Sequence, residues 1–128
     1  MNEKSLKIEG IEQISINVKD VKRAVEFYKD ILELELKFTA GNMAFLDCGG
    51  NTIVLSVPEN EEFDHRSSVL YFKVKNIEES FQLLKDRDVK FRGKPHIVHK
   101  TTTMENWMVF FEDIDNNVLA LTSYVMLN

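Results

Sequence analysis

The sequence has 128 residues, of which 44% are hydrophobic and 29% charged, and its formal net charge is −5. This length and composition are typical of one globular domain. The mildly acidic balance and the lack of a basic run exclude an ordinary nucleic-acid-binding surface, and the single cysteine excludes an internal disulfide. No stretch is long and apolar enough to cross a membrane, and the first residues lack the apolar core of a signal peptide. We therefore expect a cytoplasmic protein without a membrane partner.

The first half of the chain predicts a strand, a helix and three further strands. Residues 11–18 alternate apolar and polar side chains, which is typical of a half-buried strand. Asp20 is a good N-cap for the apolar stripe at helical spacing that follows it. Three short strands are then expected at residues 34–37, 42–46 and 52–57. Residues 8–57 therefore form a predicted βαβββ module.

The second half repeats this pattern after a polar and acidic segment. Residues 58–67 show no periodicity and predict a linker. Residues 69–74 resemble the first strand, and Asn76 is a good N-cap for a second helix. Further strands are expected at residues 90–91, 96–99, 107–112 and 118–124. Residues 68–126 thus form a second βαβββ module of the same domain. This module carries an insertion at residues 93–106, which we interpret as a long loop with a functional role, such as a lid.

Two stretches resemble a known family. Residues 11–32 contain IEQISINVKD and then AVEFYKDIL, with a Phe-Tyr pair on the helix. Residues 110–121, FFEDIDNNVLAL, resemble the closing hairpin of that family, although Ile114 and Asn116 stand where Pro and Gly are usual. The chain is therefore similar to the vicinal oxygen chelate superfamily, which includes glyoxalase I, bleomycin-resistance proteins and extradiol dioxygenases. The resemblance implies an α+β fold, in which two tandem βαβββ modules form a curved mixed sheet around a cavity.

The resemblance also implies where a metal ion would be bound. In the metalloenzymes of this superfamily, His, Gln or Glu side chains from the first and last strands of each module hold one divalent ion. These slots fall on Gln13, Val54, Val69 and Ala120 of this chain. Gln13 could coordinate through its amide oxygen, but the other three side chains have no donor atom, and one neutral ligand does not hold an ion. We therefore expect neither a metal site nor another cofactor.

What remains in the expected cavity is a pocket for an organic molecule. Strand alternation selects the side chains on the cavity side. The candidate ligand-binding residues are Gln13, Ser15, Val54, Val69, Tyr71, Met108, Phe110, Ala120 and Thr122. Apolar and aromatic walls with a few polar groups are typical of such pockets. We expect a protein that binds or sequesters a small organic compound, as bleomycin-resistance proteins do, and the sequence does not identify that compound.

An alternative is a lyase, isomerase or dioxygenase of the same superfamily with a displaced metal ion or a metal-free base. Its ligands or base would be His96, His99, Glu105 or Glu112. The two histidines are three residues apart, so on a strand they would face opposite sides, and joint ligation requires a bulge or a loop. Glu112 is the candidate catalytic base on the cavity side, but pairing with Lys73 would make it inert. The sequence leaves open whether any reaction is catalysed.

The sequence also predicts self-association. Each module is too small to bury its helix stripe and both faces of its sheet. The strand edges at residues 11–18 and 69–74 are natural joints, so we expect a C2 homodimer. Whether the two modules pair within one chain or are exchanged between two chains stays open. A module that binds a protein partner through its sheet edges is a third interpretation, which no sequence pattern favours.

Overall fold

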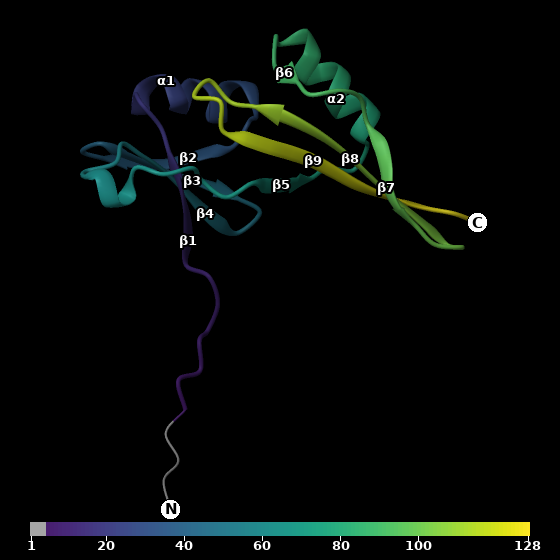
Figure 1. The fold of residues 1–128 in the computed structure, drawn as a ribbon, viewed down its shortest axis with the longest axis horizontal. Helices are drawn as coiled ribbons and strands as arrows, with labels where there is room; N and C mark the ends of the chain where they lie inside the picture. The colour runs from purple at the N-terminus through teal and green to yellow at the C-terminus, as the bar shows by residue number, and fades with distance from the viewer. Residues whose placement is uncertain (1–4) are drawn as a thin grey trace, which may run out of the picture.

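The computed structural model describes residues 5–128, and the second half of the chain repeats the element order of the first with one added strand (Figure 1). The first half contains β1 (Gln13–Asn17), α1 (Val21–Val25), the π-helical segment η1 (Glu26–Ile31), β2 (Glu35–Ala40), β3 (Met43–Cys48) and β4 (Asn51–Ser56). The linker contains the 3₁₀ turn η2 (Glu61–Phe63). The second half contains β5 (Leu70–Lys73), α2 (Ile77–Asp86), β6 (Lys90–Phe91), β7 (His96–Lys100), β8 (Met104–Glu112) and β9 (Val118–Met126).

The two halves form two sheets of matching topology. In the first sheet, β1 lies parallel to β4, and β3 and β2 follow in antiparallel order. In the second, β5 lies parallel to β9, and β8 follows, with β6 and β7 both paired to it. The helix after each first strand leads to the far edge of the sheet, and hairpins return the chain to that strand. The expected α+β fold is confirmed: the first module is βαβββ, the second adds the strand β7 to this pattern, and the strands form two sheets rather than the one curved sheet expected.

Side-chain caps begin both α-helices where the sequence predicts them. The carboxylate of Asp20 accepts a hydrogen bond from the backbone N–H of Arg23 at 3.1 Å. The side chain of Asn76 accepts one from the backbone N–H of Glu79, also at 3.1 Å. Each cap satisfies a backbone donor that has no partner within the first turn of a helix.

The first helix changes its winding after one and a half turns. The N–H of Leu32 donates to the carbonyl of Phe27, five residues earlier, at 3.0 Å, which is the bond of a π-helix. Phe27 and the adjacent Tyr28 are both buried, and their rings meet edge to face at 5.4 Å. The wider turn thus accompanies the burial of two adjacent rings, which the helical spacing of the sequence does not reveal.

Strands occupy most of the insertion at residues 93–106, so it is not one long loop, and the strand expected at residues 96–99 is present. β7 begins at His96, and β8 already begins at Met104. A β-bulge between Ile97 and His99 shifts the register of β7 against β8. β8 and β9 have nine residues each, whereas β5 has four. The β8–β9 hairpin therefore extends past the end of β5.

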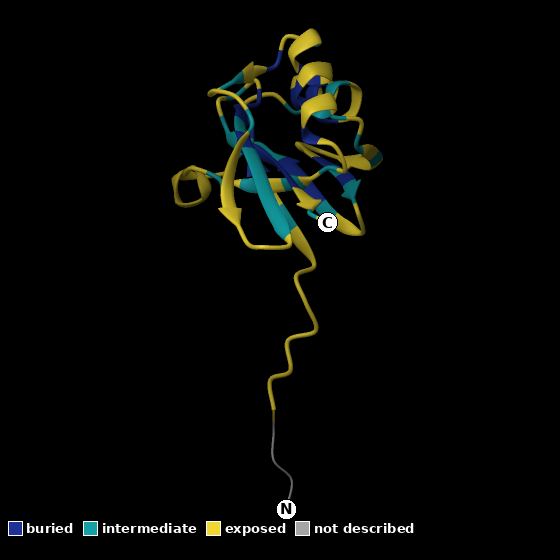
Figure 2. Ribbon diagram, turned by 90° about the vertical axis from the view of Figure 1, so that its right-hand side faces the viewer, coloured by how far each residue is buried: buried dark blue, intermediate teal, exposed yellow. Residues whose placement is uncertain are grey.

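Both helices lie on the same side of the two sheets (Figure 1). The hydrophobic core lies between the helices and the sheets and joins residues of both modules, including Ile16, Leu55, Leu84 and Phe111. In Figure 2 the buried residues are dark blue and lie within the sheets and helices of the body, and the exposed residues are yellow. We call the side of each sheet that faces away from the helices its open face.

The open faces of the two sheets are separate within one chain. Among residues 5–128, no strand of the first sheet is hydrogen-bonded to a strand of the second. The modules are joined instead through their helices and through the turn that precedes β9. None of the helices in this part of the chain combines the length and the apolar character needed to span a membrane.

Candidate functional site

The first open face is built from alternate residues of β1, β4 and β3. Ser15, Val54 and Phe45 are direct neighbours across these strands, and directly opposed residues share one face of a sheet. Ile53 and Leu55, which flank Val54, belong to the core on the helix side. Val54 therefore points to the open face, where its neighbours leave it 2% exposed.

Aromatic rings extend this face towards β2. Phe38 and Phe45 stack with their centroids 4.4 Å apart and their planes at 16°. Phe38 is 55% exposed, so much of its ring faces solvent. A stacked pair of this kind offers a flat apolar surface that a planar group can contact.

Hydroxyl groups and the linker enclose one end of the first open face. The Oγ atoms of Ser15 and Ser56 lie 3.1 Å apart. The side-chain nitrogen of Asn17 donates to the carbonyls of Phe63 and His65, each at 2.7 Å, and so holds the linker beside the end of β1. The cavity formed here has a volume of about 540 Å³. Its lining includes Ser15, Asn17, Ser56, Phe63, His65 and Arg66.

This cavity is only partly visible in the sequence. Alternation along the first strand identifies Ser15. Sequence reasoning misses Phe63 and Arg66, because no pattern in the linker reveals that Asn17 binds its carbonyl groups. The one signal is the position of Asn17 at the end of a strand, where an amide side chain can reach a neighbouring segment.

The second open face carries aromatic and apolar groups. Tyr71 and Phe110 flank Ala120 across β5, β9 and β8. Their rings approach edge to face, with centroids 6.0 Å apart and planes at 73°. Tyr71 is 52% exposed, and Met108 lies beside Thr122 in the next row. The five residues form one continuous surface on the sheet.

The remaining candidates lie at the margins of the two faces. The Thr122 hydroxyl donates to the carbonyl of Trp107 at 3.1 Å and accepts from the side chain of Asn106 at 2.8 Å. Val69 directly precedes β5 and is exposed, and Gln13 is exposed at the start of β1. Gln13 and Val69 therefore belong to the first and the second sheet, respectively.

The four metal slots of the family do not fit a divalent ion in this chain. Val54 and Ala120 are buried aliphatic side chains on different sheets. Val69 adds a third apolar group, which leaves Gln13 as a single neutral donor where three or four oxygen or nitrogen atoms are needed. Throughout residues 5–128, no three His, Cys, Asp or Glu side chains converge as metal ligands would.

The two histidines lie differently from the sequence expectation. His96 pairs with Met108 and His99 with Asn106, two residues apart on β8. The bulge in β7 therefore places both histidines on one face, whereas their spacing of three predicts opposite faces. Both side chains are exposed.

The carboxylates of the alternative site are remote from each other. Glu105 points to the other side of β8 from Asn106, and its carboxylate accepts from Trp107 Nε1 at 3.1 Å and pairs with Lys100 Nζ at 3.4 Å. Glu112 lies seven residues further along β8, which is about 23 Å on an extended strand. The structure therefore does not bring His96, His99, Glu105 and Glu112 together.

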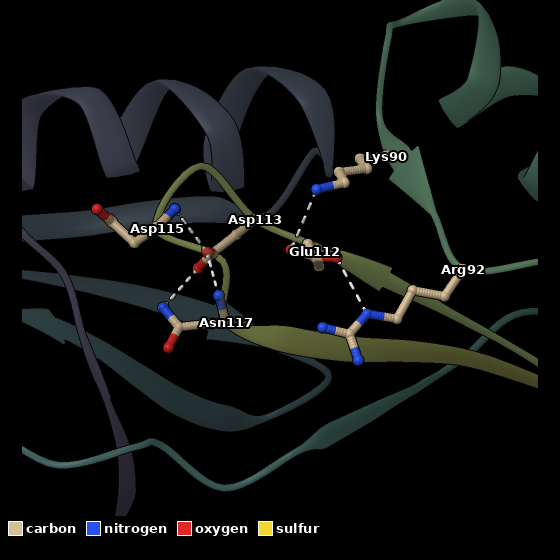
Figure 3. A network of polar contacts seen from close by, with 6 residues as sticks. All are labelled: Lys90, Arg92, Glu112, Asp113, Asp115 and Asn117. Carbon is tan, nitrogen blue, oxygen red and sulfur yellow. Dashed lines mark hydrogen bonds and ion pairs between the residues drawn. The ribbon is translucent and has the colours of Figure 1, made fainter.

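Glu112 is buried, at 8% exposure, and paired (Figure 3). Its carboxylate lies 3.0 Å from Arg92 Nε and 3.8 Å from Lys90 Nζ. Lys73, the partner expected from the sequence, pairs with Thr122 in another row of the sheet. The two cations after α2 account for the burial of a charge that would otherwise cost several kcal/mol.

A second buried carboxylate connects the modules. Asp113 accepts hydrogen bonds from the backbone N–H groups of Asp115 and Asn117, at 2.8 and 2.9 Å, and from the Asn117 side chain at 2.8 Å (Figure 3). It also accepts one from the Tyr28 hydroxyl at 2.7 Å. Burial, followed by the negative charge of Asp113, raises the pKa of Tyr28 well above its ordinary value. The Asn117 side chain also donates to the carbonyl of Asn17 at 2.9 Å, so this network fixes the turn against the first module.

The single cysteine is unsuited to nucleophilic chemistry. Cys48 ends β3 and is partly buried. Burial, followed by the charge of Asp47, raises the pKa of its thiol. Since the thiolate is the reactive form, this thiol is a poor nucleophile at neutral pH.

Known proteins resemble this chain over most of its length. The family model of the Glyoxalase/Bleomycin resistance protein/Dioxygenase superfamily matches residues 10–121. The uncharacterized protein YraH of Bacillus subtilis (strain 168) is 30% identical over 132 residues, which cover 90% of this chain and 97% of YraH. The metallothiol transferase FosB of Staphylococcus epidermidis (strain ATCC 35984) is 25% identical over 122 residues, covering 91% of this chain and 82% of FosB.

A solved structure shows the same fold. The crystal structure of a glyoxalase/bleomycin resistance protein/dioxygenase superfamily member from Sphaerobacter thermophilus DSM 20745 matches with a TM-score of 0.75 and 21% identity. The match covers 91% of this chain and 98% of that chain. Because the family model also spans both modules, the chain belongs to the glyoxalase/bleomycin resistance protein/dioxygenase superfamily.

Proposed function

We propose that this protein binds a small organic molecule with a planar apolar part, and that it does so without the metal ion of its family. The observation that carries the proposal is the pair of open faces, each with an exposed aromatic ring on the same face as a small buried aliphatic side chain. Phe38 and Tyr71 provide the exposed rings, and Val54 and Ala120 provide the flat floor. Hydroxyl and amide groups at the margin, such as Ser15, would orient a polar end of the ligand.

The composition of the four metal slots supports binding in place of metal-assisted chemistry. FosB is by name a metallothiol transferase. In this chain, three of the four slots carry no donor atom, so a ligand on these faces would meet apolar walls. The retained fold and its apolar slots therefore favour a protein that sequesters its ligand over a metal-dependent enzyme.

We further propose that the complete pocket forms in a C2 homodimer. The two open faces are separate within one chain, and each exposes large apolar side chains that are costly to leave in water. β1 and β5 are edge strands of their sheets. Placing the first open face of one copy against the second open face of another would cover both, and the two-fold symmetry would build two equivalent pockets.

A thermal-shift screen tests this function. The panel contains an aromatic carboxylate, a phenol, an aromatic amine and a planar heterocycle, together with Zn²⁺, Ni²⁺ and Mn²⁺ as separate probes. A compound that binds the native state raises its melting temperature with increasing concentration. We expect a shift with at least one aromatic probe, with one binding site per chain by calorimetry and the compound recovered unchanged.

Matched variants locate the site. Tyr71→Ala should weaken binding of that probe by about tenfold or more, since it removes one stacking partner. Leu83→Ala is the control, because Leu83 is similarly exposed, at 46%, but lies on α2. Near-stoichiometric metal in protein purified without chelator, or turnover of the probe, would overturn the proposal in favour of an enzyme of the superfamily.

A further inference from the structure

The segment before β1 has the pattern of a strand but lies in solvent. Residues 5–12 project from the body of the molecule as an exposed segment without helix or strand (Figures 1 and 2). Leu6 and Ile8 are 86% and 79% exposed and alternate with Lys7 and Glu9. This alternation is typical of a half-buried strand. Lys7 has a φ of +46°, which side chains with a Cβ rarely adopt, so the present conformation is not a favoured one.

The apolar side chains of this segment share a face when it is extended. Ile16 of β1 points into the core. Side chains of an extended strand return to the same face every second residue, so this face continues through Ile14 back to Ile8 and Leu6. A continuation of β1 would therefore present both side chains on the helix side of a sheet.

An unpaired strand edge exists at the end of β9. The carbonyl of Thr122 accepts from the N–H of Val74 at 2.9 Å, just where β5 ends. Alternate residues of an antiparallel strand direct their backbone groups to the same side, so Tyr124 and Met126 present theirs on this side too. Within the described part of the chain, no strand pairs with them there.

A hollow lies beside this edge on the helix side of the sheet. Its volume is about 320 Å³, and its lining combines the polar residues Lys75, Asn76, Glu78, Glu105 and Ser123 with Ile77, Trp107 and Val125. The Ser123 hydroxyl is buried there and has no hydrogen-bond partner among residues 5–128. Ile77, Trp107 and Val125 give the hollow apolar walls of a size that aliphatic side chains fill.

We propose that residues 6–11 of one copy pair, as an added strand, with the free edge of β9 in a second copy. The pairing rests on the dimer proposed above. Leu6 and Ile8 fill the hollow, and Glu9 and Glu12 of the segment lie near Lys73 and Lys75 at the end of β5. The donor is a second copy because the segment and the end of β9 leave the body in different directions within one chain (Figure 1). This is strand addition, in which main-chain bonds give affinity and alternate side chains give specificity.

Amide hydrogen exchange at Tyr124 and Met126 tests the pairing in the full chain. Strand pairing protects these amides, so Leu6→Ser with Ile8→Ser should accelerate their exchange by about tenfold or more. Lys7→Ser is the matched control, since Lys7 lies between the two residues on the other face, and it should leave the exchange unchanged. Sedimentation of the same samples reports the dimer separately. A dimer whose Tyr124 and Met126 amides exchange freely overturns the strand pairing alone, and a monomer overturns the dimer as well.

Disulfide trapping tests which copy donates the strand. Ile8→Cys and Val125→Cys are made separately in a Cys48→Ser chain, one of them is labelled with ¹⁵N, and the two are mixed and oxidised. We expect a peptide that links residue 8 of one copy to residue 125 of the other by mass spectrometry. Ile8→Cys mixed with Leu83→Cys should give no such link. Equal linking in both mixtures overturns the proposal, as does a link confined to one chain when both cysteines are present together.

Discussion

The hydroxyl of Tyr28 donates a 2.7 Å hydrogen bond to the carboxylate of Asp113, across 85 positions of sequence. Tyr28 belongs to the first module, and Asp113 to the turn before the last strand of the second. Both groups are buried. This bond therefore connects the helical layer of one module to the closing hairpin of the other, and it contributes to the angle at which the two open faces are held.

Tyr28→Phe should lower the free energy of unfolding by about 1 kcal/mol. The cost stays moderate because Asp113 retains three other donors, two of them from Asn117. Urea denaturation measures the change. Tyr124→Phe is the control and should stay within about 0.5 kcal/mol of the parent, since Tyr124 is exposed. Equal effects of the two substitutions would show that the Asp113 bond contributes no stability.

The same pair predicts a loss of stability in alkali. The pKa of Tyr28 is raised from its ordinary value of 10.0 in the folded state, first by burial and then by Asp113. Above pH 10 the unfolded chain releases this proton while the folded chain retains it, so unfolding becomes easier as the pH rises. The difference in unfolding free energy between the parent and Tyr28→Phe should therefore fall by about 1.4 kcal/mol per pH unit above pH 10. Denaturant titrations between pH 9 and 11 check this, and a constant difference would contradict it.

Arg92→Ala should destabilise the protein more than Glu112→Gln does. Removing Arg92 leaves the buried Glu112 carboxylate with Lys90 as its remaining cation, at 3.8 Å, and we expect a cost of about 2 kcal/mol. Gln at position 112 has no charge to compensate and can still accept from Arg92, which limits the cost to about 1 kcal/mol. The double variant should be more stable than Arg92→Ala alone. Additive losses in a double-mutant cycle would contradict the pairing.

Gln13→Ala should leave the metal content of the purified protein unchanged. Gln13 has no partner ligands in the four metal slots, because Val54, Val69 and Ala120 have no donor atoms. Elemental analysis of both proteins, expressed with added Zn²⁺ and purified without chelator, is the measurement. An ion that is present in the parent and lost from the variant would refute the conclusion that the four slots hold no metal ion.

The elements that local chemistry determines could be predicted from the sequence. Asp20 and Asn76 begin helices because their side chains bind backbone donors nearby. The alternation around Val54 separates a core face from an open face because strand side chains have a period of two. Membership of the family could also be predicted, because the residues of its closing hairpin, 110–121, are contiguous in the sequence. Asn116 adopts a φ of +63° where the family usually has Gly, a conformation that Asn tolerates better than most residues.

What the sequence could not reveal depends on register and on distant partners. The face of His99 depends on a bulge, because one extra residue changes the alternation, and the sequence does not reveal whether this bulge is present. The partner of Glu112 proved to be Arg92 rather than Lys73, because the pairing depends on where β6 meets β8. The cavity under the linker depends on a contact between Asn17 and carbonyl groups 46 and 48 residues later, and backbone carbonyls leave no signature in a sequence.

The hydrogen bonds between Asn17 and the linker also determine where the chain can accept an inserted peptide. The carbonyls of Phe63 and His65 are pinned, and the Ser67 hydroxyl accepts from the Asn17 N–H at 2.9 Å. Lengthening the chain within this stretch would pull at least one of these contacts apart. Extra residues placed ahead of it, next to Glu59, would add flexible loop, whose closure entropy grows slowly with length. A reporter peptide inserted there would stand at the rim of the cavity, where Glu59 is part of the lining, and leave the contacts of Asn17 with Phe63, His65 and Ser67 in place.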